Sequence, residues 1–197
     1  MKIGITGGIG SGKTTICRIF ETLGIPVFYA DTVAKQIMVD DEILIKGVKD
    51  TFGQESYLPD GGLNNKHIAN IVFNNEAELL KLNQLVHPAV FRAFDTWVAN
   101  LKTEVPYVLK EAALLFESGS YKMCDKNILV TAPLELKLDR VIKRDQVTAE
   151  QVKARMDKQL TDEQKIKLAD YLIHNDESNS LIQQVLELHH LFLNIKH

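Results

Sequence analysis

The stretch GGIGSGKT, residues 7–14, stands directly after the apolar run Ile3-Gly4-Ile5 near the start of the chain. It satisfies the pattern G-x-x-x-x-G-K-[ST], in which backbone N–H groups surround the phosphates of a nucleotide. The context also fits, because the stretch follows an expected strand, residues 3–6, and opens an expected helix, residues 13–23. The alternative is a tight glycine turn, which would not need a Lys-Thr pair at its end. The sequence therefore predicts a nucleoside triphosphate site here.

Each residue type in this loop has a predicted contact. Glycine at 10 and 12 lets the backbone approach the phosphates without an intervening Cβ, and Lys13 can reach the β and γ oxygens. The Thr14 hydroxyl is an expected ligand of the Mg²⁺ that accompanies ATP. The predicted ATP-binding residues of the loop are Gly8, Gly10, Ser11, Gly12, Lys13, Thr14 and Thr15.

The rest of the chain alternates apolar runs with helical patterns, which predicts a parallel sheet with ligands at the carboxyl ends of its strands. Further strands are expected at 25–29, 106–109, 127–131 and 171–174, and further helices at 32–39, 133–143 and 181–195. Capping-box patterns, Thr148 with Gln151 and Thr161 with Gln164, mark two more helix starts. We predict one three-layer α/β domain with a five-stranded parallel sheet. Its core is 1–39, 101–139 and 168–197, with a helical insertion at about 40–100 and a lid at about 140–167.

The composition excludes several classes of protein. Of 197 residues, 45% are hydrophobic and 25% charged, as in a folded soluble domain, and the formal charge of −3 argues against a nucleic-acid partner. No signal peptide and no run of ~20 apolar residues occurs, so a cytoplasmic protein with no membrane partner is expected. Cys17 and Cys124 form no C-x-x-C pair and are interpreted as buried thiols, and His189 and His190 as surface residues. A monomer or a small homo-oligomer is compatible with this composition.

Motifs that are missing narrow the nucleotide-binding classes. A GTPase would show Asn-Lys-x-Asp and Asp-x-x-Gly at suitable places, and neither is present there. DNA-directed ATPases usually have a larger core and a more basic surface. A small-molecule kinase fits the length of the chain.

The chain resembles the dephospho-CoA kinase family over nearly its full length. The residues that carry the resemblance are Thr6–Thr14, Ala30-Asp31-x-x-Ala34-Lys35, Val86-His87-Pro88, Leu114-Leu115-Phe116-Glu117, Arg144-Asp145, Gln159, and Ala169-Asp170 with Ile173 and Asn175. The resemblance implies transfer of the γ-phosphate of ATP to the ribose 3′-hydroxyl of dephospho-CoA, the final step of coenzyme A biosynthesis. It also implies the strand order of nucleoside monophosphate kinases, with the third strand beside the first.

Asp31 is the expected catalytic carboxylate. It follows the second predicted strand, and a kinase needs a group that orients the acceptor hydroxyl and accepts its proton. Taken alone, Asp31 fits a helix N-cap or a solvated turn equally well, and the resemblance assigns it the catalytic role. The family usually carries another acid two positions earlier, where this chain has Tyr29, so Asp31 is the sole candidate in this motif.

Glu111 follows the third predicted strand, where the family often has Asp, and it is the candidate to hold a Mg²⁺-bound water. The alternative is an exposed acid paired with Lys110 or another cation. Ala113 stands where the family commonly has Pro, which would alter the turn more than the chemistry.

Arg140 and Arg144 are four residues apart, so a helix places both on one face. By resemblance they become catalytic lid arginines that neutralise charge on the transferring phosphoryl group. From spacing alone, a charged helix face shared with Lys137 and Lys143 explains them better.

The resemblance supplies the remaining site residues. Lys35, His87 and Arg92 become candidates for binding dephospho-CoA, and Asn175 for a position near the adenine of ATP. Two alternatives stay open, namely a kinase of another small acceptor and a module that senses ATP without transferring phosphate.

Overall fold

The computed structural model describes residues 1–73, 75–102 and 104–195. The chain divides into two compact units, one made of Met1–Tyr29 with Lys102–His197 and the other of Ala30–Leu101. In the described part of the chain, no helix combines the length and apolar character of a membrane span. The first unit contains the phosphate loop and the whole sheet.

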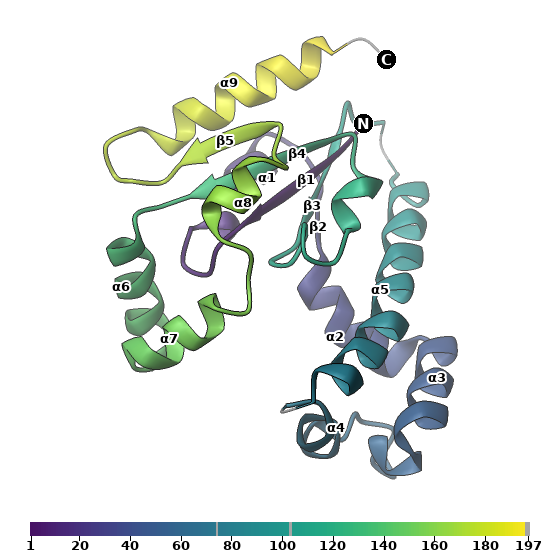
Figure 1. Ribbon diagram of the computed structural model, residues 1–197. Coiled ribbons are helices and arrows are strands. Elements are labelled where there is room, and N and C mark those ends of the chain that lie inside the picture. The colour runs from purple at the N-terminus through teal and green to yellow at the C-terminus, as the bar shows by residue number, and fades with distance from the viewer. Residues whose placement is uncertain (74, 103, 196–197) are drawn as a thin grey trace. The chain divides into compact units, whose positions relative to one another are not determined.

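A five-stranded parallel sheet forms the centre of the first unit (Figure 1). The strands are β1 (Lys2–Gly7), β2 (Val27–Tyr29), β3 (Val108–Glu111), β4 (Lys126–Thr131) and β5 (Tyr171–His174). Their order is β2-β3-β1-β4-β5, and every neighbouring pair is parallel. This confirms the predicted sheet and the third strand beside the first. The phosphate loop therefore starts from the central strand.

Helices α1 (Lys13–Thr22) and α9 (Leu181–Asn194) share an apolar core with one face of this sheet. Alternate strand residues and apolar helix positions meet there, as the periods of 2 and 3.6 residues require. The fully buried members include Ile3, Ile5, Ile16, Phe20, Ile128, Val130 and Val185. This packing fixes the position of α1, the helix that begins where the phosphate loop ends.

The other elements of the first unit are η2 (Ser120–Met123), α6 (Leu134–Asp145), α7 (Ala149–Met156) and α8 (Asp162–Ile166). Both predicted capping boxes are present at the starts of α7 and α8. At α7, the Thr148 hydroxyl accepts from the Gln151 N–H at 3.3 Å and the Gln151 side chain accepts from the Thr148 N–H at 3.0 Å. These local bonds satisfy N–H groups that have no partner within the helix.

Three features differ from the sequence-based prediction. Strand β3 lies two residues later, because its pairing with β1 continues until Ile5 faces Glu111. Helix α2 (Ala30–Asp40) begins two residues earlier, directly after β2. His189, expected at the surface, is only partly exposed, and its Nδ1 lies 2.6 Å from the hydroxyl oxygen of the fully buried Tyr107.

The second unit is helical and has a core of its own. It consists of α2, α3 (Glu42–Phe52), η1 (Gln54–Ser56), α4 (Asn65–Val72) and α5 (Glu76–Ala99). The buried residues of this core cluster are Met38, Leu44, Val48, Phe52, Tyr57, Ile68 and Ala89. Helix α2 belongs to this unit from its first residue, and the boundary near residue 40 stays a prediction.

Candidate active site

The loop between β1 and α1 has the curvature that phosphate binding needs. Gly10 and Gly12 have φ of 80° and 93°, a left-handed conformation that side chains other than glycine rarely adopt. The Ser11 N–H donates to the Gly8 carbonyl at 3.1 Å and closes the turn. At its end, the Lys13 Nζ donates to the Gly7 carbonyl at 2.9 Å. The amine therefore folds back across the loop, in reach of an anion bound there.

Thr14 and Thr15 are exposed in the first turn of α1. Because both residues are exposed, their side chains can contact a ligand at the N-terminus of the helix. The loop and this first turn bring together all the predicted phosphate-binding residues.

The glycines of the loop are needed because other segments pack tightly against them. A Cβ placed on Gly12 would lie 2.2 Å from the Asn175 Nδ2, and one on Gly10 would lie 2.4 Å from the Lys137 carbonyl oxygen. Both distances are far below van der Waals contact. The Asn175 Nδ2 donates to the Ser11 carbonyl at 2.8 Å. The loop therefore keeps its shape through contacts with α6 and with the segment after β5.

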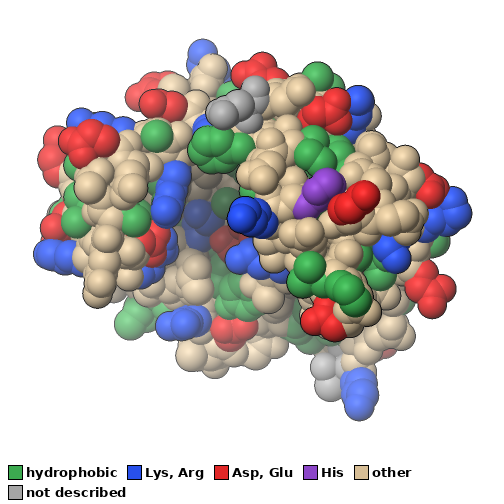
Figure 2. Space-filling view, turned by 90° about the horizontal axis from the view of Figure 1, so that it is seen from below, with side chains coloured by type: hydrophobic (Ala, Val, Ile, Leu, Met, Phe, Trp, Pro, Cys, Tyr) green, Lys and Arg blue, Asp and Glu red, His purple; other side chains and the backbone are tan. Residues whose placement is uncertain are grey.

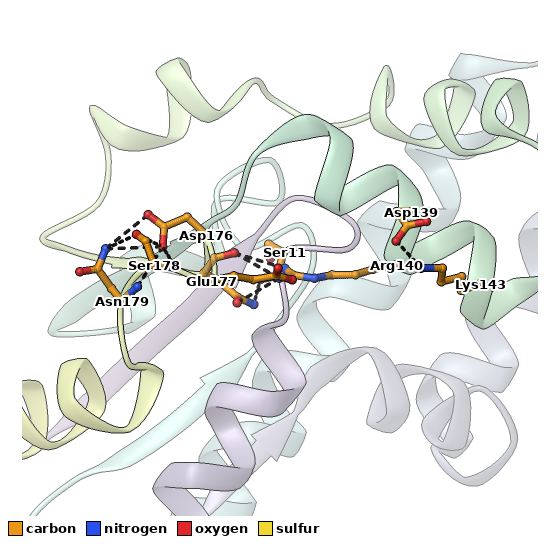
Figure 3. Close-up of polar contacts among 9 residues, drawn as sticks. Ser11, Asp139, Arg140, Lys143, Asp176, Glu177, Ser178 and Asn179 are labelled. Carbon is orange, nitrogen blue, oxygen red and sulfur yellow. Dashed lines mark hydrogen bonds and ion pairs between the residues drawn. The ribbon is translucent and has the colours of Figure 1, made fainter.

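Arg140 extends this contact from α6. Its two terminal nitrogens each lie 3.3 Å from the Asn175 backbone oxygen, and one of them is also 3.2 Å from Glu177 Oε1. Figure 3 shows Arg140 reaching from its helix to the loop after β5, close to Ser11. The resemblance puts Asn175 near an adenine, but its amide lies against the phosphate loop and connects the loop to Arg140.

Arg144 lies on the same helix and has different partners. Its guanidinium bonds both carboxylate oxygens of Asp145, at 2.7 and 3.1 Å, and Arg155 bonds the same carboxylate at 3.0 Å. These contacts lower the pKa of Asp145, chiefly through the Arg144 hydrogen bonds. Lys143 pairs with Asp139 at 2.7 Å on the exposed side of α6. The structure therefore brings Arg140 to the phosphate loop and leaves the exposed Arg144 beside α7.

The predicted metal-associated residues present oxygen donors. Glu111 ends β3 with 7% of its surface exposed and is in register with Ile5 on β1. A carboxylate and a threonine hydroxyl are the hard donors that Mg²⁺ accepts. Within the described ranges, no group of three or more His, Cys, Asp or Glu residues could hold a metal ion. These donors fit an ion that shares its ligands with phosphate oxygens and water.

Tyr29 faces Glu111 across the β2–β3 pair. Burial, followed by the nearby Cys17 and Glu21, raises the pKa of its hydroxyl above the ordinary value. The side chain that replaces the family's usual acid is therefore a neutral phenol.

Gln159 contacts the phosphate loop, a role that the sequence analysis did not assign to it. Its Oε1 accepts from the Ile9 N–H of the loop at 3.0 Å, and its Nε2 lies 3.3 Å from the Ala113 carbonyl oxygen. Lys137 and Asp162, 2.7 Å apart, lie on the same side of the loop, each within 3.6 Å of a Cβ placed on Gly8. Gln159 carries part of the family resemblance, but no periodicity links it to residue 9.

The predicted acceptor residues belong to the helical unit. Asp31 and Lys35 are both exposed on α2, four residues apart and so on one face of the helix. His87 lies within α5, with its ring stacked 6.5 Å from that of Phe91. Arg92, also on α5, pairs with Asp41 at 2.9 Å. The chain places Asp31 two residues after the end of β2.

Charged side chains of both signs are interspersed on the face shown in Figure 2.

Comparisons with known proteins agree with this geometry. A family model described as dephospho-CoA kinase matches residues 1–180. The dephospho-CoA kinase of Bacteroides fragilis is 36% identical over 188 residues, which cover 95% of this chain and 91% of the relative. A crystal structure from Thermus thermophilus is 31% identical with a TM-score of 0.82, covering 100% of this chain and 98% of the other. The dephospho-CoA kinase structure from Campylobacter jejuni is 29% identical with a TM-score of 0.67, covering 96% of each chain.

Proposed function

Because this chain belongs to the dephospho-CoA kinase family, we propose that its phosphate loop, Asp31 and the α6 arginines transfer the γ-phosphate of ATP to the ribose 3′-hydroxyl of dephospho-CoA. The products are CoA and ADP. The observation that carries the proposal is the loop itself, a complete phosphate-binding sequence held in shape by Asn175 and Gln159.

The triphosphate binds along the loop. Backbone N–H groups of residues 8–15 and the N-terminus of α1 contact its oxygens, and Lys13 exchanges the Gly7 carbonyl for the β and γ phosphates. Because the loop is already curved, little conformational entropy is lost when ATP binds.

Mg²⁺ is the metal we propose for the ATP complex. Thr14 would hold it directly and Glu111 through a water. When bound, the ion would supply positive charge that neutralises the phosphates of ATP.

Asp31 orients the 3′-hydroxyl and takes its proton, early or late along the reaction. Its position after β2 is that of a carboxylate at the carboxyl end of a sheet strand, where ligands bind in such folds. We assign Lys35, His87 and Arg92 to the acceptor, where the cationic side chains of Lys35 and Arg92 suit its phosphates.

Arg140 and Arg144 stabilise the charge of the transferring phosphoryl group. Arg140 already reaches the loop through Asn175, whereas Arg144 must leave Asp145 to do so. Movement of residues 140–167 as a lid would provide that change and exclude water, so that phosphate goes to the acceptor.

We propose a cytoplasmic location, where ATP is available and the free thiols of Cys17 and Cys124 stay reduced. A monomer or a small homo-oligomer would serve this function equally well.

The test compares wild type with Asp31→Asn in ATP-dependent phosphorylation of dephospho-CoA and of a panel of other small acceptors. We expect wild type to prefer dephospho-CoA, and D31N to lose about 10²- to 10⁴-fold in kcat, the usual contribution of a general base. Asp40→Asn, on the exposed end of the same helix, is the matched control and should retain activity.

Two results would contradict the proposal. Phosphorylation of other acceptors but not of dephospho-CoA would identify a different kinase. ATP binding without transfer to any acceptor would identify a nucleotide-sensing module.

A further inference from the structure

One side chain joins two parts of the phosphate site that are far apart in the sequence. The Gln159 Oε1 accepts from the Ile9 N–H at 3.0 Å, and its Nε2 donates to the Ala113 carbonyl at 3.3 Å. That carbonyl also accepts from the Thr6 hydroxyl at 3.4 Å. Ala113 lies two residues after Glu111, the end of β3. The amide therefore spans from the phosphate loop to the turn beside the proposed metal-water ligand.

The partners determine which end of the amide points where. A backbone N–H can only donate and a backbone carbonyl can only accept, so the oxygen of Gln159 must face Ile9 and its nitrogen must face Ala113. Among uncharged side chains of this length, only the amide offers both functions at once. A carboxylate would place a second acceptor against the Ala113 carbonyl.

The backbone on both sides of Gln159 is anchored. The Gln159 N–H donates to the Met156 carbonyl at 2.9 Å, and the next N–H, from Leu160, donates to Glu117 Oε1 at 2.9 Å. Glu117 in turn lies 3.1 Å from the Nζ of the fully buried Lys165. Because its main chain is held at these points, the Gln159 side chain can keep the loop at Ile9 in a fixed position.

We propose that Gln159 is a positioning residue for phosphoryl transfer, holding the loop at Ile9 in register with the turn after Glu111. It acts through the loop and does not itself touch the reacting atoms. The inference rests on the proposed function for its reaction, but the loop contact it describes can be measured with ATP alone. Losing this register shifts the phosphates relative to the metal and the acceptor, and a displacement of about 1 Å can cost on the order of 10²-fold in rate.

The test uses Gln159→Met, which keeps the length of the side chain but can neither accept nor donate at these two sites. At a temperature where circular dichroism shows full folding, we expect kcat to fall about 10- to 100-fold, with KM for dephospho-CoA unchanged within about twofold. A merely structural role would lower the melting temperature and leave kcat per folded molecule unchanged. Gln183→Met, an exposed position on α9, is the matched control.

Gln159→Glu is the second variant if the methionine variant does not fold. It keeps the acceptor for Ile9 and loses the donor to Ala113, so kcat should again fall. A kcat within about twofold of wild type in the folded variant overturns the proposal. If wild type itself does not phosphorylate dephospho-CoA, the proposed function fails, and the dissociation constant of ATP decides the role of Gln159. A rise of threefold or more in the variant then supports that role, and a smaller change overturns it.

Discussion

Replacing Asn175 with alanine tests whether the segment after β5 stabilises the phosphate loop. Asn175 is 9% exposed, and its Nδ2 donates to the carbonyl of the fully buried Ser11 at 2.8 Å. The lost hydrogen bond contributes about 1 kcal/mol, and the Ser11 carbonyl, left without its partner, adds about 1–2 kcal/mol. Arg140 also loses its bond to the Asn175 Oδ1, but its guanidinium is partly exposed and bonds water in its place. The expected cost is about 2–3 kcal/mol of unfolding free energy.

For a chain of this size, that loss lowers the melting temperature by roughly 5–10 °C. Without the Asn175 contact the phosphate loop is less ordered, and ATP binding must then order it. The dissociation constant of ATP should therefore rise about tenfold, equivalent to about 1.4 kcal/mol. Calorimetric unfolding and isothermal titration with Mg·ATP measure the two quantities. The control is Asn179→Ala, whose exposed side chain bonds Asp176 and Ser178 (Figure 3).

Asn175→Asp separates the donor from the acceptor. The carboxylate still accepts from Arg140 but faces the Ser11 carbonyl with a second oxygen, so this variant should lose at least as much as the alanine. A melting temperature within about 1 °C of wild type for N175A, together with an unchanged ATP affinity, would refute the idea that this amide holds the loop.

Two further predictions concern titratable groups of the first unit. Burial, with the adjacent His190, lowers the pKa of His189. As the pH falls, His189 is therefore protonated first in the unfolded chain, near pH 6.5, which favours unfolding. The free energy of unfolding, measured by urea titration at each pH, should decrease between pH 7.5 and 5.5. The decrease should be less steep in His189→Gln. Equal slopes would exclude a contribution from the His189–Tyr107 contact. Lys165→Met removes the fully buried partner of Glu117 and should cost about 3 kcal/mol of unfolding free energy. The double variant with Glu117→Gln should recover part of this loss, whereas a loss under about 1 kcal/mol in the single variant would show that the pair contributes little to stability.

Local signals in the sequence are sufficient for the elements that frame the site. The glycines and the Lys-Thr pair of residues 7–14 form one continuous motif, and each capping box joins a threonine to the glutamine three residues later. Their geometry follows from short-range sterics and hydrogen bonding, which a single sequence contains.

Contacts between distant segments cannot be predicted in the same way. Gln159 bonds the loop across 150 residues and Asn175 across 164, and neither has a pattern that names its partner. The two-residue shift of β3 has a similar origin. Its polar end, Lys110-Glu111, is typical of the start of a loop, but pairing with β1 buries both side chains in the strand. Tertiary pairing outweighs the local preference of these residues.

The phosphate loop offers a reason why its supports come from so far away. Three of its five residues, 8–12, are glycine, so the loop has few side chains with which to stabilise its own curvature and loses more backbone entropy on ordering than other segments do. The missing stabilisation comes from the last third of the chain, through Lys137 packed on Gly10, Gln159 on Ile9 and Asn175 on Ser11. These three contacts belong to the segments that flank or form the predicted lid. Any movement of residues 140–167 must therefore keep the Gln159 contact or change the loop with it. If the Gln159 and Asn175 contacts act together, N175A should not weaken ATP binding further in a Q159M background. If they act independently, the losses of ATP affinity from the two substitutions should add.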